Sequence, residues 1–188
     1  MVALSYMSHG YQVRDQRGTY FLTFQAVDWV DIFSRQIYRD IVVDSFNYCI
    51  ANKSLVVTAY VIMTNHVHAI LRTKEKDLSD VIRDFKAHTA RQILKNVEVN
   101  TESRQTWMKH VFAFHANQHK RNELQQLWTH ENHAVFMDPS VPGMFQSRIN
   151  YIHQNPVRAG WVLHAEHYIY SSAVDYAGGK GLVNVEIA

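Results

Sequence analysis

The sequence predicts an α+β fold, in which an antiparallel sheet carries helices on one of its faces. Segments that alternate like strands and segments with helical spacing follow one another in the order strand, helix, strand, strand, helix, with a further strand and helices after them. The second and third strands meet at a short break, Thr64-Asn65, which is typical of a hairpin. This order fits a ferredoxin-like sheet with its helices packed together on one side.

The first half of the chain supplies three strands and one helix. Residues 19–27 have apolar side chains on both faces, which predicts a central strand. A helix from an N-cap at Ser34 to about Asn52 follows, because its apolar residues recur at three- and four-residue intervals. Residues 55–63 are apolar and rich in β-branched side chains, as in a buried strand, and residues 65–72 form its hairpin partner.

The second half of the chain is expected to be mostly helical. Helical spacing of apolar residues predicts a helix over about 78–95 and another over 107–116. Residues 133–136 suggest a further extended segment. The last long helix is expected over 143–155, where Pro156 interrupts the hydrogen-bond ladder, with room for a further turn over 157–159 that stops at Gly160.

Length and composition indicate a globular protein. A chain of 188 residues is expected to form one domain, with residues 1–18 as a polar lead-in. The net charge of +2 permits nucleic-acid binding without demanding it. Cys49 is the single cysteine, which excludes an internal disulfide and suits a reducing compartment. No apolar run approaches the roughly 20 residues that cross a bilayer, and the N-terminus lacks a secretory apolar region. We therefore expect a cytoplasmic protein with no membrane partner.

A His-Val-His sequence in the predicted hairpin is the first candidate site. Side chains alternate along a strand, so His66 and His68 are expected to point to the same face. The other face, with Val67 and Leu71, is apolar and should lie against helices, which would leave the histidine face open. Two imidazoles so placed can share a divalent metal. Because the chain contains 12 histidines, the pair by itself equally fits two half-exposed strand residues.

The last predicted helix supplies the second candidate group. Arg148, Tyr151 and Asn155 are three and four residues apart, so they stack on one side of this helix. A tyrosine hydroxyl becomes a nucleophile when its proton is removed and the electrophile is polarised. A divalent metal bound to a phosphodiester oxygen supplies that polarisation, and Mg²⁺ or Mn²⁺ suits two imidazoles and one oxygen. Asn155 can supply the oxygen, although it fits a helix-ending role almost equally well, and His153 is the alternative ligand.

Two stretches resemble motifs of one protein family. Residues 63–70, MTNHVHAI, resemble the MPNHVHLL motif of the single-tyrosine HUH transposases, particularly the REP-associated group. Residues 151–160, YIHQNPVRAG, are similar to the YIHxNPVRAG motif of the same family. The similarity runs from about residue 19 to 178, but residues 97–125 do not align. Thr64 stands where the family has proline, which is expected to change the rigidity of the turn more than the chemistry.

The resemblance implies an activity and a set of site residues. It implies metal-dependent cleavage and rejoining of single-stranded or hairpin DNA through a 5′-phosphotyrosine intermediate, by a monomer or a homodimer. It places metal ligation on His66 and His68, the third ligand on Asn155, and nucleophilic attack on Tyr151.

Three basic residues are candidates for phosphate contacts, and two other functions stay open. Lys86, Arg148 and Arg158 are expected to bind DNA, with a merely solvated surface as the alternative. The modest charge and Thr64 leave room for a domesticated hairpin-binding protein with little or no catalysis. An initiator of plasmid or phage replication would share the histidines and the tyrosine, but the short chain favours the transposase-like group.

Overall fold

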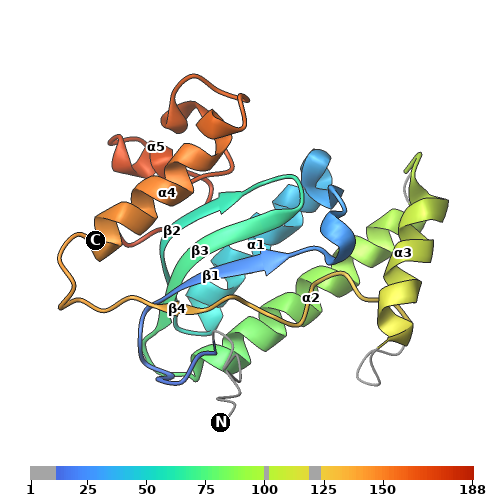
Figure 1. Cartoon of the computed structure of the whole chain (residues 1–188), viewed down its shortest axis with the longest axis horizontal. Helices are drawn as coiled ribbons and strands as arrows, with labels where there is room; N and C mark the ends of the chain where they lie inside the picture. The colour runs from blue at the N-terminus through green and yellow to red at the C-terminus, as the bar shows by residue number, and fades with distance from the viewer. Residues whose placement is uncertain (1–11, 100–101, 119–123) are drawn as a thin grey trace, which may run out of the picture.

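The computed structural model describes residues 12–99, 102–118 and 124–188. Part of the predicted lead-in (1–11) and parts of the segment 97–125 (100–101 and 119–123) therefore lie outside the described residues. Among the described helices, none has the length and apolar character needed to cross a membrane. The elements follow one another as shown in Figure 1: β1 (Tyr20–Gln25), η1 (Val27–Trp29), η2 (Ile32–Ser34), α1 (Gln36–Asn52), β2 (Leu55–Ile62), β3 (His66–Thr73), α2 (Leu78–Val99), α3 (Gln105–Asn117), β4 (Val135–Phe136), α4 (Met144–Arg158), η3 (Ala165–His167) and α5 (Ala173–Tyr176).

The four strands form one antiparallel sheet in the order β2-β3-β1-β4. The predicted α+β class and antiparallel sheet are confirmed, and β1 lies inside the sheet as expected. β4 contains only two residues and pairs with Tyr20 and Phe21 of β1. It is shorter than the predicted extended segment 133–136, because His133 and Ala134 lie outside it.

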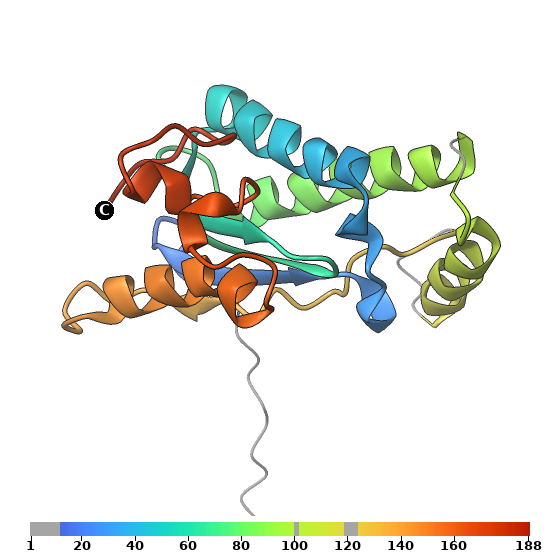
Figure 2. The same ribbon diagram turned by 90° about the horizontal axis from the view of Figure 1, so that it is seen from above.

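Helices α1 and α2 cover one face of the sheet (Figure 2). Leu22 and Phe24 of β1 and Tyr60 of β2 point into this layer, where they pack among residues such as Phe46 of α1 and Phe85 of α2. Val67, Ala69 and Leu71 of β3 belong to the same buried cluster. The apolar face of β3 therefore lies against helices, as its alternating pattern predicted.

The other face of the sheet is not open, which corrects the expectation of helices on one face only. α4 lies on it (Figure 2), with Ile149 and Ile152 packed against Phe21, Val61 and Ile70. The physical reason is that β1 and β2 are apolar on both faces, so both faces need to be covered. This second packing layer places α4 beside the histidines of β3.

Two predicted helix ends differ from the structure. α1 begins at Gln36 after Arg35, so Ser34 is not its N-cap residue, and the Ser34 hydroxyl instead accepts a hydrogen bond from Arg104. α4 continues through Pro156 to Arg158, although Pro156 has no N–H and donates no hydrogen bond to the helix. The chain then leaves the helix at Gly160, whose φ of 75° is favourable for glycine.

Candidate functional site

The β2–β3 hairpin presents the two histidines. The backbone N–H of Met63 donates to the carbonyl of His66 (2.8 Å), which closes the connection between the strands. The rings of His66 and His68 lie on the same face of β3, with centroids 4.6 Å apart and planes at 69°. The prediction that the pair shares one face is confirmed.

Each imidazole has a hydrogen-bond partner at Nδ1. The Oγ1 atom of Thr23 lies 2.8 Å from Nδ1 of His68, and Oδ1 of Asn65 lies 2.6 Å from Nδ1 of His66. An amide oxygen only accepts, so the proton of His66 resides on Nδ1 and its Nε2 carries the lone pair. Partners of this kind orient metal-binding histidines in general. Sequence reasoning missed both partners; Asn65 could have been found, because it directly precedes His66.

Burial keeps both imidazoles neutral. Loss of solvation lowers the pKa of His66 from its ordinary value to about 4. Burial, followed by electrostatic repulsion that His66, Arg158 and Arg148 would exert on a protonated ring, lowers the pKa of His68 to about 3. At neutral pH the rings therefore have lone pairs available for a cation. Only 7% of the His68 surface is exposed, which corrects the expectation of an open site.

Tyr151 of α4 lies beside His68 in the same chain. The two ring centroids are 5.3 Å apart with planes at 66°. Phe21 of β1 contacts both: its ring stacks on His68 at 5.3 Å and meets Tyr151 edge-on at 5.9 Å. Tyr151 stays 39% exposed, so its ring has a packed side and a side open to solvent. Phe21 could not be found as a site residue from the sequence, because it looks like any apolar residue of a central strand.

Two arginines of α4 belong to the same cluster. The Arg158 guanidinium lies 4.8 Å from the centre of the Tyr151 ring and donates to the Tyr151 carbonyl (2.9 Å). The Arg148 guanidinium lies 5.2 Å from the centre of the Phe21 ring. The structure thus brings two of the three predicted DNA-binding residues to the histidines and the tyrosine. A planar guanidinium is well suited to bind a phosphate.

The family model described as "Transposase IS200 like" matches residues 22–130, more than half of the chain. The chain belongs to the IS200-like transposase family. The predicted family resemblance is confirmed. The matched region of this IS200-like transposase includes His66 and His68 and ends before Tyr151.

One solved structure shows the same fold as the IS200-like transposase. A REP-associated tyrosine transposase bound to a REP hairpin aligns with a TM-score of 0.59 at 18% identity, covering 96% of this chain and 92% of that chain. A putative transposase from Deinococcus radiodurans aligns with a TM-score of 0.41 at 17% identity, covering 72% of this chain and 90% of that chain. A search for relatives among proteins with curated functions found no match.

Asn155 and His153, the two predicted candidates for the third metal ligand of the IS200-like transposase, both lie on α4. The Asn155 amide donates through Nδ2 to the Tyr151 carbonyl (2.7 Å), one turn beyond the tyrosine. His153 is buried; its Nε2 lies 2.8 Å from the Ser172 hydroxyl and its ring packs on Tyr176, toward α5. The His153 ring is thus engaged on the α5 side, and the Asn155 amide is engaged with the backbone of its own helix.

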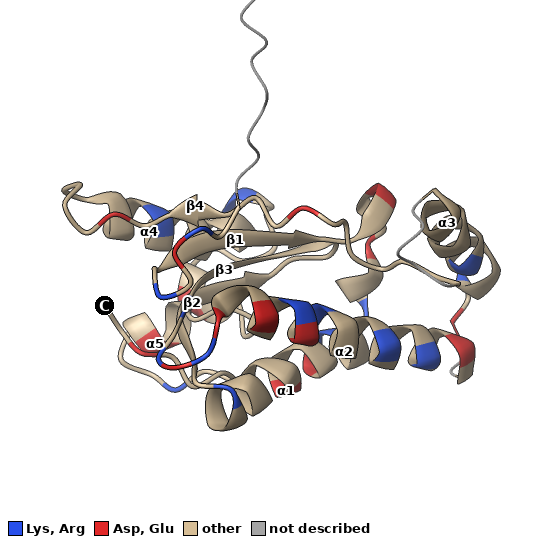
Figure 3. Cartoon of the chain, turned by 90° about the horizontal axis from the view of Figure 1, so that it is seen from below, with Lys and Arg blue, Asp and Glu red and all other residues tan. Residues whose placement is uncertain are grey.

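The third predicted DNA-binding residue is not brought to the cluster. Lys86 lies on α2, which packs on the other face of the sheet and carries several of the basic residues coloured in Figure 3. Its Nζ donates to the Thr129 carbonyl (2.8 Å) and to Oδ1 of Asn132 (2.6 Å). Burial lowers the pKa of Lys86 to about 8. In this structure Lys86 connects α2 to the segment before β4 through these hydrogen bonds. Its predicted contact with a DNA phosphate stays a prediction.

Proposed function

We propose that this IS200-like transposase cleaves and rejoins single-stranded DNA, with Tyr151 as the nucleophile. The observation that carries the proposal is the 5.3 Å separation between the rings of Tyr151 and His68 within one chain. Two residues that are far apart in the sequence thereby meet on one face of the sheet. A nucleophile next to groups suited to polarise its target is the arrangement that covalent catalysis requires.

The chemistry conserves the energy of the broken bond. The Tyr151 oxygen attacks the phosphorus of a phosphodiester and loses its proton, while the bond from phosphorus to the 3′ oxygen breaks. The 3′ oxygen takes up a proton and leaves as a hydroxyl, and the 5′ phosphate stays linked to Tyr151. A second 3′ hydroxyl can then attack this linkage and release Tyr151, so strands are rejoined without ATP. Arg148 and Arg158 supply positive charge for the phosphate.

The residues present fit a divalent cation. His66 and His68 have their Nδ1 atoms engaged, which leaves Nε2 of each ring for coordination. No group of three or more His, Cys, Asp or Glu side chains suited to a metal occurs within residues 12–99, 102–118 and 124–188, so the set needs another oxygen ligand. The Asn155 amide is our candidate. Bound Mg²⁺ or Mn²⁺ would withdraw charge from the phosphodiester oxygen and lower the barrier to attack.

The proposed substrate class is hairpin DNA with a single-stranded flank. The solved relative of the same fold was captured with a REP hairpin. In this chain, Arg148 and Arg158 place two positive charges beside Tyr151, where a phosphate of the flank would lie. The net charge of +2 is small, so we expect a few local phosphate contacts rather than a broad basic surface.

Covalent capture tests this proposal. The protein is incubated with single-stranded and hairpin oligonucleotides from its genomic neighbourhood and Mn²⁺, and DNA-linked protein is separated on a denaturing gel. We expect an adduct with the unmodified protein and none with Tyr151→Phe. Tyr48→Phe is the matched control, because Tyr48 is an exposed tyrosine on α1, in the other layer. An equal adduct from Tyr151→Phe would refute the assignment, whereas hairpin binding by an unmodified protein that forms no adduct would indicate the domesticated binding protein.

A further inference from the structure

Trp29 is an exposed tryptophan held in an unfavourable backbone conformation. Asp28 and Trp29 have φ values of 53° and 54°, in the left-handed region that side chains other than glycine rarely adopt. Both residues are exposed, and 59% of the Trp29 surface is accessible, although Val27 and Val30 on either side are buried. The turn therefore directs a large aromatic side chain away from the core.

The backbone around this turn is attached to the hairpin that carries the histidines. The N–H of Ala26 donates to the Asn65 carbonyl (2.9 Å), and the N–H of Phe33 donates to the Thr64 carbonyl (2.8 Å). The Trp29 ring consequently lies next to His66, with centroids 6.0 Å apart and planes at 81°. The position of the indole is thus coupled to the position of the histidine pair.

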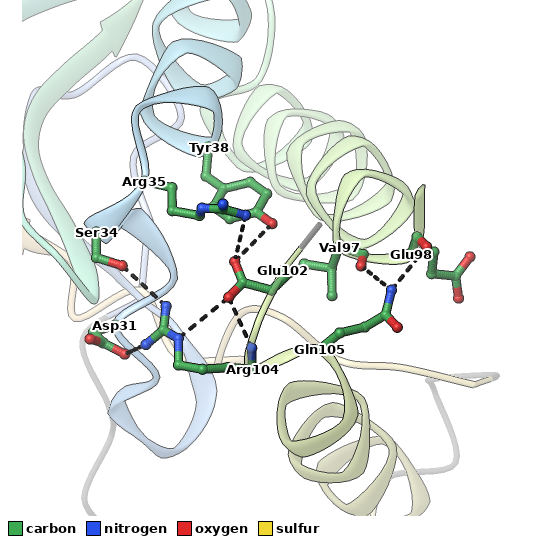
Figure 4. Close-up of polar contacts among 9 residues, drawn as sticks. All are labelled: Asp31, Ser34, Arg35, Tyr38, Val97, Glu98, Glu102, Arg104 and Gln105. Atoms are coloured by element: carbon green, nitrogen blue, oxygen red, sulfur yellow. Dashed lines mark hydrogen bonds and ion pairs between the residues drawn. The ribbon is translucent and has the colours of Figure 1, made fainter. Parts of the chain in front are cut away.

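A second set of contacts holds the far end of the same loop (Figure 4). Arg104 forms an ion pair with Asp31 and donates to the Ser34 hydroxyl (3.1 Å). The Glu102 carboxylate accepts from Arg35 (3.2 Å) and from the Tyr38 hydroxyl (3.4 Å). The segment that precedes α3 therefore holds residues 31–38 in place, so the loop has contacts at both of its ends.

We propose that Trp29 is a stacking platform for an unpaired nucleobase of the DNA that enters the site. The inference rests on the proposed function and adds a binding residue to it. Trp29 contacts the ring of His66, while Tyr151 contacts the ring of His68, so the two exposed aromatic side chains lie at the two ends of the histidine pair. A phosphodiester at Tyr151 would bring a neighbouring nucleotide over the histidines, toward the indole.

The chemistry of the turn favours a base rather than a phosphate. Every nucleobase has a π face that stacks on an aromatic ring, so such contacts tolerate any sequence. The acidic side chain of Asp28, directly before Trp29, repels phosphate oxygens. A pinned indole also loses little conformational entropy on binding, because its backbone is already ordered.

Binding measurements without cleavage test the platform. In a Tyr151→Phe background and without added metal, we measure the affinity for an oligo(dT) strand by fluorescence anisotropy. We expect Trp29→Ala to weaken binding about tenfold or more. Trp29→Tyr, which keeps an aromatic ring, should restore most of the affinity. Tyr48→Ala, which removes an exposed aromatic ring from the other layer, should leave it unchanged.

A double-mutant cycle separates stacking from other effects of the substitution. Abasic nucleotides are placed one at a time along the oligo(dT) strand, and each strand is measured with the protein that retains Trp29 and with the Trp29→Ala variant. We expect one position at which the lost base weakens binding to the Trp29 protein but not to Trp29→Ala, because the two changes remove the same contact. Additive losses at every position, or no binding of oligo(dT) at all, would overturn the inference. An unchanged affinity of Trp29→Ala for oligo(dT), together with a sedimentation shift of this variant from dimer to monomer, would also overturn the inference. That result would assign Trp29 to a contact between protein subunits.

The outcomes for catalysis and for stacking are distinguishable. An adduct at Tyr151 without a coupled abasic position would leave the proposed reaction standing and refute the platform. A coupled position in a protein that forms no adduct would support the platform and refute the reaction.

Discussion

The hydroxyl oxygen of Thr23 lies 2.8 Å from Nδ1 of His68, across the boundary between β1 and β3. The two residues are direct partners in the antiparallel register of these strands. If Nε2 of His68 binds a cation, Nδ1 carries the proton and donates to Thr23. The threonine then sets the orientation of the ring and its tautomer together.

We expect Thr23→Val to lower the affinity for Mn²⁺ about 10- to 100-fold, the range typical for loss of such a partner. Valine has nearly the same shape, so the fold should be retained while the hydrogen bond is lost. Thr23→Ser keeps a hydroxyl and should bind Mn²⁺ almost as well as the unmodified protein. Isothermal titration calorimetry measures the affinities. Equal affinities for the valine and serine variants would show that Thr23 does not position His68.

The proximity of Tyr151 and His68 in one chain predicts a site assembled within a single subunit. A mixture of Tyr151→Phe and His68→Ala proteins should then form no more DNA adduct than the His68→Ala protein alone. The mixture is incubated under conditions that allow subunit exchange, and the adduct is quantified on a denaturing gel. Recovery of adduct on mixing would instead mean that one subunit provides the tyrosine and another the histidines.

Glu102 is expected to stabilise the attachment of α3. Its carboxylate is nearly fully buried between Arg35 and Arg104. Burial alone would raise its pKa, but the backbone hydrogen bond from Arg104 and the two guanidinium charges outweigh burial and lower the pKa below its ordinary value. We expect Glu102→Ala to lower the free energy of unfolding by about 1–3 kcal/mol, measured by urea titration.

The control for Glu102 is an ion pair at the surface. Arg83 pairs with Asp80 and Asp84 on the exposed side of α2, and such pairs contribute little. Arg83→Ala should therefore leave the urea midpoint almost unchanged. If both variants unfold at the same urea concentration, the buried network is not a significant source of stability.

Stability should decrease between pH 6.5 and 5. Burial lowers the pKa of His66 and of His153 to about 4, and that of His68 to about 3, from an ordinary value of 6.5. Below pH 6.5 these three histidines bind protons in the unfolded chain but remain neutral in the folded chain. Lowering the pH therefore favours unfolding. The free energy of unfolding should be highest above about pH 7 and fall by up to about 1.4 kcal/mol per pH unit for each of the three residues.

Urea titrations at pH 7.5, 6.0 and 5.0 measure this dependence. Asp84 does not account for a change in this range, because the hydrogen bonds from Lys53 and Arg83 lower the pKa of its carboxyl. A free energy of unfolding that stays constant from pH 7.5 to 5.0 would mean that the three imidazoles are protonated equally easily in both states.

Local patterns predicted which candidate site residues share one face of a single element. The period of two along a strand placed His66 and His68 on one face. The spacing of three and four residues placed Arg148, Tyr151 and Asn155 along one side of the last helix. These patterns depend only on backbone geometry, so they can be read from one sequence.

Relationships between elements were predicted less well. The expectation of an open histidine face was wrong, because nothing in the spacing of Ile149 and Ile152 says which face of the sheet α4 covers. Thr23 was missed, because its contact with His68 depends on the register of two strands that are not consecutive. Trp29 was missed, because its exposure follows from the positive φ angles of Asp28 and Trp29, which no pattern in the sequence predicts.

The amino-acid sequence by itself determined the order of the elements, the shared face of the two histidines and the side of the helix that carries the tyrosine. Hydrophobic periodicity encodes each of these within a few neighbouring residues. The tertiary structure alone decided that Tyr151 lies against His68, that α4 covers the histidine face of the sheet and that Trp29 lies beside His66. Those outcomes depend on how both apolar faces of the sheet become covered, which is a property of the packed chain as a whole.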